Sequence, residues 1–203
     1  MGREARAMTD SERDPGSDTR SEKAKMLAGE LYLASDPTLR QERMRARTLT
    51  RRYNSTTEEE AELRSQILGD LFGRLGPGVE IEPPFHCDYG YNILAGADLY
   101  MNFGCVVLDC CPVRIGDNVM LGPYVQLLGA YHPLDPGLRL THRELAAPIS
   151  IGSNVWIGAG AIIGAGVTIG DESVIGAGSV VIRDVPAGVL AAGNPCRVIR
   201  SLS

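Results

Sequence analysis

The sequence predicts a left-handed parallel β-helix, a solenoid in which three hexapeptides form each triangular coil. Aliphatic residues recur every six positions at Ile151, Ile157, Ile163, Ile169 and Ile175, and a Gly follows each of them. This period fits neither a helix nor the alternation of a half-buried strand. We expect the first residue of each hexad to stack in the core. Gly then occupies the tight position after it.

The same period continues upstream and survives an interruption. Ile115 and Ile151 lie 36 positions apart, a whole number of hexads, so a loop excursion over about residues 129–149 can leave the solenoid and return in register. The step from Val107 to Ile115 is eight positions, which predicts a two-residue bulge near residues 110–112. We expect about five coils. A Gly-rich all-β domain without a solenoid would not be expected to hold one phase across such an excursion.

Three regions are expected along the 203 residues. Charged residues mixed with Gly, Pro and Ser predict a disordered tail over residues 1–20. Residues 21–76 are expected to form a helical cap on the acceptor side. Residues 77–203 are expected to form the β-helix domain with its loop and a C-terminal tail.

Capping signals predict three helices in the cap. Ser21 can cap a first helix over residues 24–33, and Asp36 followed by a proline opens a second helix through about Tyr53. Thr57 and Glu60 form a capping box for a third helix that ends at Gly76. The arginines of the second helix are interpreted as an ordinary solvated face; they are Arg40, Arg43, Arg45, Arg47, Arg51 and Arg52.

Composition narrows the class of protein. The sequence contains no apolar run of eighteen residues, so it predicts no membrane span. The N-terminus lacks the apolar core of a signal peptide, and we therefore expect a cytoplasmic protein. A net charge of −5 gives no reason to expect a nucleic-acid partner. The five cysteines are odd in number and form no CxxC pair, which favours small core residues in a reducing compartment.

One histidine stands where the repeat breaks. His132 lies in the stretch GAYHPLDP, at the start of the loop excursion. The unperturbed pKa of histidine lies near 6.5, so an imidazole at the edge of a rigid scaffold can take a proton from a hydroxyl. From its position alone, His132 fits a general base and a loop-capping residue equally well.

Several stretches make the chain similar to the hexapeptide-repeat sugar O-acetyltransferases, in particular the maltose and galactoside acetyltransferases with their nodulation relatives. They are MLAGELY, RARTLTRRYN, YGYNI, YMNFGCVVLDCCPVRIGD, HPLDP, IGSNVWIG and GNPCRVIR. The resemblance covers about nine-tenths of the chain. It implies transfer of an acetyl group from acetyl-CoA to a sugar hydroxyl of a maltose, glucose or galactoside type, without an acyl-enzyme and without a metal.

The resemblance assigns an acceptor side. His132 matches the family's catalytic base, and Asn102 matches a residue of the acceptor pocket. Tyr100, Asp109 and Asp88 fall in stretches that the resemblance places near the sugar hydroxyls. Cys110 stands where the galactoside enzymes have a second acidic residue, which favours the maltose-type pattern.

The resemblance also assigns a cofactor side. The backbone N–H of Ala159 matches the donor to the thioester carbonyl, and Ala177 matches a small residue along the pantetheine arm. Trp156 fits packing and a ligand wall equally well. Ile182, Arg183 and Arg197 match the end of the channel that holds the phosphates and adenine, where solvated charge is the alternative for the two arginines. The family's active sites lie between subunits, which implies a homotrimer with a small-molecule sugar as partner.

Three alternatives remain open. The acceptor could be an antibiotic or an amino-sugar oligosaccharide. A zinc enzyme of the γ-carbonic anhydrase type would need three histidines from adjacent coils, whereas His132 and His142 both fall in the loop and His86 lies far upstream. A non-catalytic scaffold would have no need for His132, Asn102 and the turn at Ala159 together.

Overall fold

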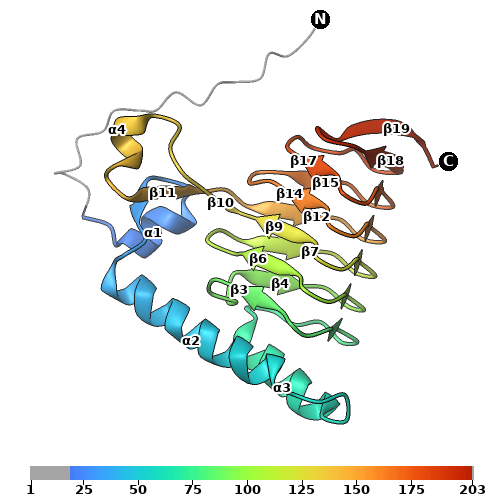
Figure 1. Ribbon diagram of the computed structural model, residues 1–203, viewed down its shortest axis with the longest axis horizontal. Coiled ribbons are helices and arrows are strands. Elements are labelled where there is room, and N and C mark those ends of the chain that lie inside the picture. Colours follow the sequence, from blue (N-terminus) through green and yellow to red (C-terminus); the bar gives the residue numbers. More distant parts are fainter. Residues whose placement is uncertain (1–18, 203) are drawn as a thin grey trace, which may run out of the picture.

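The computed structural model describes residues 19–202 and shows a parallel β-solenoid with a helical region along one side (Figure 1). The expected disordered tail over residues 1–20 falls almost entirely outside the described residues. Within residues 19–202, no helix is both long and apolar enough to cross a membrane.

Three stacks of short strands form the faces of the solenoid. The first face holds β4 (Ile93–Ala95), β7 (Val113–Ile115), β12 (Ile149–Ile151) and β15 (Thr168–Ile169). The second face holds β2 (Glu80–Ile81), β5 (Tyr100–Met101), β8 (Met120–Leu121), β13 (Trp156–Ile157), β16 (Val174–Ile175) and β18 (Val189–Ala192), and β19 (Arg197–Ser201) pairs antiparallel with β18. The third face holds β3 (His86–Cys87), β6 (Val106–Leu108), β9 (Gln126–Leu128), β14 (Ile162–Ile163) and β17 (Val180–Val181).

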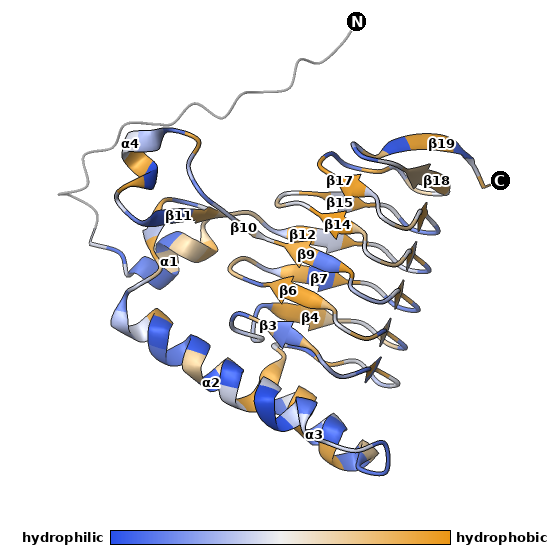
Figure 2. Cartoon of the chain, in the orientation of Figure 1, coloured by the Kyte–Doolittle hydropathy of each residue, from blue (hydrophilic) through white to orange (hydrophobic). Residues whose placement is uncertain are grey.

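The strand register confirms the six-residue period. Ile151 pairs with Ile169, and Ile157 pairs with Ile175, each eighteen positions later in the chain. These side chains are buried in one continuous core, as expected for the first residue of each hexad. In Figure 2, apolar strands follow one another along the solenoid, whereas the long helix beside it is largely hydrophilic.

The upstream coils are longer than the downstream coils, and the extra residues lie at one corner. Ala95 pairs with Ile115, twenty positions later, because each of these coils inserts residues between a third-face strand and the next first-face strand. We name this corner the insertion corner. It carries the segments 88–92 and 109–112, and then the long excursion over residues 129–148. The expected bulge is confirmed, and it has a second copy one coil earlier.

The helical region differs from the expectation at two ends. The first helix, α1 (Glu22–Leu27), is capped by the Ser21 hydroxyl as expected, but it ends before Gly29, which has a φ of 73° that favours glycine. Tyr32 and Leu33 form strand β1 (Tyr32–Leu33) instead of continuing the helix.

The other two helices follow the capping signals more closely. Helix α2 (Pro37–Asn54) begins after the Asp36 cap, as expected. Helix α3 (Ala61–Leu71) ends earlier than expected, because Gly76 already hydrogen-bonds with Ala95 in the first coil.

The excursion folds back onto the helical region. It contains β10 (Ala130–Tyr131), α4 (Pro136–Arg139) and β11 (Arg143–Ala146), and it forms the antiparallel sheet β1–β11–β10. The Arg143 guanidinium lies 3.5 Å from a Glu22 carboxylate oxygen, which adds an ion pair between the excursion and α1. The excursion is therefore held against the cap, and residue 132 follows directly after β10.

Candidate functional site

A cavity of about 390 Å³ lies at the insertion corner. Each element around it contributes side chains. Tyr32 and Ala34 come from β1 and the turn after it, and Arg43 and Arg47 come from one face of α2. The insertion corner supplies the others, which are Asp88, Tyr89, Leu108, Cys110, Ala130, Tyr131, His132 and Glu144. Three consecutive insertions and the cap thus build one pocket, which lies in the size range of small-molecule sites.

Four charged side chains line this pocket together with His132. Arg43 donates to the Tyr89 hydroxyl at 2.6 Å and to the Ala34 carbonyl, and its guanidinium lies 5.6 Å from the Tyr89 ring centroid. The Tyr32 hydroxyl donates to the Glu144 carboxylate at 2.9 Å. Arg47 and Asp88 complete the set, so two arginines and two carboxylates balance in formal charge.

The His132 imidazole is exposed and makes no hydrogen bond among the described residues. Its position is fixed by the backbone, because β10 pairs with β11 immediately before it and Pro133 after it is buried. An accessible imidazole at the mouth of a polar pocket can reach a hydroxyl bound inside it.

Asp88 faces the pocket from the first insertion. Burial raises the pKa of the Asp88 carboxyl, while the Cys110 thiol and the positive charges of Arg43 and Arg47 act against that rise. The Cys110 thiol lies 3.5 Å from an Asp88 carboxylate oxygen as a donor. Burial also raises the pKa of this thiol, so Cys110 stays neutral and acts as a donor here.

Asp109 does not open onto the pocket. Its side chain is fully buried, and Oδ1 accepts hydrogen bonds from the backbone N–H groups of Tyr89 at 2.8 Å and Asp88 at 3.1 Å. Oδ2 accepts from the N–H of Asn92 at 3.3 Å. The expected contact between Asp109 and a sugar hydroxyl would therefore have to compete with these three backbone donors.

Replacing Asp109 with Asn should change how stability depends on pH. Burial raises the pKa of the Asp109 carboxyl from its ordinary value of 3.8 to about 7, against the opposing effect of the Tyr89 and Asn92 N–H donors. Between these two values the folded state binds a proton that the unfolded state has lost, so the free energy of unfolding should fall as pH rises from about 4 to about 7. Urea unfolding measured between these pH values should show that the free energy of unfolding falls less steeply with pH in Asp109→Asn than in the parent. The same pH dependence in both proteins would contradict the raised pKa of Asp109.

Tyr100 and Asn102 lie away from His132 within one chain. Tyr100 is on β5 of the second face, and Asn102 directly follows this strand. The Asn102 side-chain oxygen accepts from the backbone N–H of Phe103 at 2.7 Å, and the Asn102 backbone N–H donates to the Leu121 carbonyl. The third face separates these residues from the pocket of the same chain.

Ala159 and Ala177 follow the second face in successive coils. A Cβ added to Gly122 would lie 2.7 Å from the Ala159 nitrogen, and one added to Gly158 would lie 2.5 Å from the Ala177 nitrogen, so only glycine permits this stacking. We name this column the alanine corner. Both alanines are exposed, and within residues 19–202 neither backbone N–H has a hydrogen-bond acceptor. Each N–H is thus available to a ligand.

The other residues that the resemblance assigns to the cofactor lie in three places. Trp156 points outward from β13 and is half-exposed beside Met120 in the same ladder. Ile182 and Arg183 follow β17, at the same corner as His132 but in a later coil. Arg197 begins β19, and its guanidinium donates to the Cys196 carbonyl at 2.8 Å. One chain does not bring all of these residues to a single cleft.

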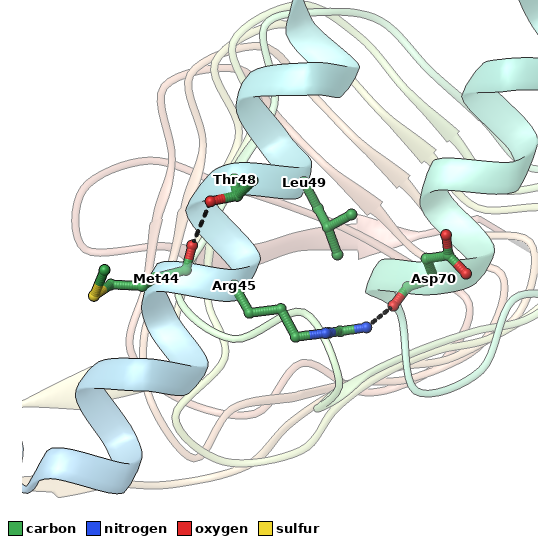
Figure 3. A pocket seen from close by; sticks show the side chains of 5 residues that line it. All are labelled: Met44, Arg45, Thr48, Leu49 and Asp70. Atoms are coloured by element: carbon green, nitrogen blue, oxygen red, sulfur yellow. Dashed lines mark hydrogen bonds between the residues drawn. The ribbon is translucent and has the colours of Figure 1, made fainter.

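A second cavity, of about 360 Å³, lies between α2 and α3 (Figure 3). It is lined by Met44, Arg45, Thr48, Leu49 and Asp70. The Arg45 guanidinium donates to the Asp70 carbonyl, and the Thr48 hydroxyl donates to the Met44 carbonyl at 2.9 Å. The Arg45 and Thr48 donors are therefore engaged with backbone carbonyls. The lining holds one arginine and one carboxylate, and it has no histidine, unlike the pocket at the insertion corner.

Neither a disulfide nor a metal-binding cluster is found among the described residues. Cys87, Cys105, Cys110 and Cys111 are free and buried, as expected for core residues, and Cys110 also lines the pocket. Cys196 is free and only partly buried against the core. In the part of the chain that the structure describes, no group of three or more His, Cys, Asp or Glu side chains is arranged to hold a metal ion.

Three charged residues of the pocket were not predicted from the sequence. Arg43 and Arg47 were interpreted as part of a solvated helix face, and the structure corrects this, because both line the pocket one helical turn apart. Their spacing of four residues was the available signal. Glu144 carried no signal, because its place depends on the antiparallel pairing of β1 with β11.

Two family models match the chain. The maltose acetyltransferase hexapeptide capping motif matches residues 25–76, and the bacterial transferase hexapeptide model, with six repeats, matches residues 148–183. Among curated relatives, nodulation protein L of Rhizobium meliloti (strain 1021) is 53% identical over 89% of this chain and 98% of its own length. Galactoside O-acetyltransferase of Escherichia coli (strain K12) is 42% identical over 88% of each chain.

Solved structures agree with the sequence relatives. A maltose O-acetyltransferase from Clostridium difficile 630 superposes with a TM-score of 0.90 at 50% identity, over 92% of this chain and 100% of that one. A galactoside acetyltransferase in complex with coenzyme A superposes with a TM-score of 0.88 at 41% identity, over 91% of this chain and 92% of that one. The chain belongs to the maltose and galactoside O-acetyltransferase family of hexapeptide-repeat acetyltransferases.

Proposed function

We propose that this acetyltransferase moves the acetyl group of acetyl-CoA to a hydroxyl of a neutral sugar bound in the pocket at the insertion corner. The observation that carries the proposal is the convergence of His132 with two arginines and two carboxylates in one cavity. Balanced charges give a sugar both donors and acceptors for its hydroxyls without favouring an ionic ligand. The related structures in complex with coenzyme A or acetyl coenzyme A support acetyl-CoA as the donor.

The proposed chemistry needs one base and one oxyanion donor. The His132 imidazole takes the proton of the acceptor hydroxyl while that oxygen attacks the thioester carbonyl carbon. The carbonyl oxygen becomes an oxyanion, which the free N–H of Ala159 stabilises. The tetrahedral intermediate then collapses, the C–S bond breaks, and the CoA thiolate takes the proton from the imidazolium. No acyl-enzyme forms.

A panel of acceptors tests this function. The protein is incubated with acetyl-CoA and one acceptor at a time, and free CoA thiol is measured. Maltose, glucose and a galactoside should release thiol well above the rate without acceptor. An antibiotic and an amino-sugar oligosaccharide form the comparison arms. Faster release with either of these, and none with neutral sugars, would move the acceptor class to the alternative.

We further propose that the working site lies between subunits of a homotrimer. His132 lies at the insertion corner. Asn102, Ala159 and Ala177 lie at the alanine corner, on the other side of the third face, so one chain alone leaves them apart from His132. Large apolar side chains on and beside the second face are about half exposed or more, namely Phe103, Met120, Tyr124 and Trp156. A neighbouring copy that covered this surface would bring one chain's Asn102 toward the other chain's His132.

Mixing two impaired variants tests the shared site. Asn102→Ala should weaken use of the sugar acceptor and leave CoA binding intact, whereas His132→Ala should lose turnover. If the two residues come from different subunits, trimers assembled from equal amounts of both variants should have about a quarter of their sites intact. Recovered activity after co-expression would support the shared site. Mixed trimers no more active than the two variants measured separately would contradict it.

A further inference from the structure

The segments 88–92 and 109–112 are insertions of neighbouring coils and lie one above the other at the insertion corner. The Asp109 side chain makes three of the hydrogen bonds between them. Asp109 reaches from the second insertion to three backbone N–H groups of the first, which belong to Asp88, Tyr89 and Asn92. The Asn92 side-chain amide returns a hydrogen bond to the Asp109 carbonyl at 2.7 Å. The first insertion is thus tied at both ends.

The tied segment forms one wall of the pocket. Asp88 and Tyr89 both line the cavity, whereas Asp109 lies behind them and is absent from its lining. The Tyr89 hydroxyl in turn accepts the hydrogen bond from Arg43. A chain of contacts therefore runs from the buried carboxylate through Tyr89 to the arginine on α2. Cys110, the residue after Asp109, donates to the Asp88 side chain.

We infer that Asp109 is a positioning residue, which sets the place of the Asp88 carboxylate and the Tyr89 ring for the acceptor and does not itself touch the acceptor. This inference rests on the proposed acceptor pocket and changes the part that Asp109 plays in it. Loop segments with few contacts open readily, and a fully buried carboxylate with three backbone donors removes that freedom. The effect of Asp109 should therefore reach the acceptor and spare acetyl-CoA.

Two substitutions at one position separate positioning from bulk stability. Asp109→Asn keeps an oxygen that can accept from the Asp88 and Tyr89 N–H groups, whereas Asp109→Ala removes every acceptor. The KM for the sugar should rise about tenfold or more in Asp109→Ala and less in Asp109→Asn, with the KM for acetyl-CoA changed by no more than about twofold. Equal rises in both KM values, or an unchanged sugar KM in both variants, would overturn the inference.

Asp117 offers a matched control. Its Oδ1 also accepts a backbone N–H from the preceding coil, that of Ala97 at 2.7 Å, but it lies at a different corner. Asp117→Asn should leave the sugar KM unchanged. A double-variant cycle with Asp88→Ala tests the route of the effect, because Asp109→Ala should add little to the sugar KM once the Asp88 carboxylate is gone. Full additivity would show that Asp109 does not act through Asp88.

A measurement without turnover separates this inference from the proposed function. Amide hydrogen exchange is followed for the peptide containing residues 88–92 in the unliganded full chain. Exchange there should be faster in Asp109→Ala than in the parent, and Asp117→Asn should not affect it. Unchanged exchange would overturn the inference even if the parent acetylates sugars. If the parent acetylates none, the proposed function fails, while faster exchange would still establish that Asp109 holds this wall.

Discussion

Replacing His132 with Ala should lower kcat by about 10²–10⁴-fold, the usual contribution of a general base to a proton transfer. The residue follows β10, stands at the mouth of the charged pocket, and makes no hydrogen bond among the described residues that would give it a structural task. The affinity for acetyl-CoA should change little, because the imidazole acts on the acceptor hydroxyl. Steady-state kinetics with a responsive sugar gives kcat, and calorimetry gives CoA affinity.

The other two histidines serve as controls for this substitution. His86 lies exposed on β3 of the third face, and His142 lies in the excursion beyond α4. Neither lines the pocket, so His86→Ala and His142→Ala should keep most of the parental turnover. A His132→Ala enzyme with near-parental kcat would remove the assignment of the base.

Arg183→Ala or Arg197→Ala should raise the KM for acetyl-CoA by about 10- to 150-fold, the value of one hydrogen bond to a charged group. Both side chains are exposed, and they lie in the last coils of the solenoid, beyond Ala177. The effect on kcat should be smaller, because the phosphates of CoA are bound equally in the ground and transition states.

A truncated donor provides the control for the two arginines. Acetyl-pantetheine lacks all of the phosphates of CoA, so it should be a poor substrate for the parent and should lose little more in either arginine variant. Equal losses with acetyl-CoA and with acetyl-pantetheine would mean that Arg183 and Arg197 act through structure. The cofactor channel would then lie elsewhere.

The solenoid could be predicted because a short repeated sequence pattern determines it. A strict spacing of aliphatic residues from Ile151 to Ile175 specifies which side chains stack, and the same spacing locates the bulge before Ile115. Strand β1 was missed because Tyr32 pairs with Glu144, 112 residues later in the chain, and no local pattern in the sequence indicates that pairing. Tertiary pairing overrides helix propensity there.

Only part of the candidate site could be predicted from the sequence. His132 stands at a break in the repeat, and the family resemblance names it as well. The roles of Arg43 and Arg47 depend on which face of α2 meets the insertion corner, and six arginines on one helix do not specify that face. In the sequence, Asp88 and Asp109 look alike, because both are acidic residues in predicted loops. Only the structure shows that Asp88 lines the pocket, whereas Asp109 is buried behind it.

The most direct test of the central claim follows the acetyl group itself. The full chain is mixed with acetyl-CoA labelled in the acetyl group and a responsive neutral sugar, the reaction is quenched within one turnover, and protein and sugar are analysed by mass spectrometry. Direct transfer predicts label on a sugar hydroxyl, none on the protein, and loss of the labelled sugar with His132→Ala. Label attached to the protein before it reaches the sugar, or unchanged transfer by His132→Ala, would contradict the account.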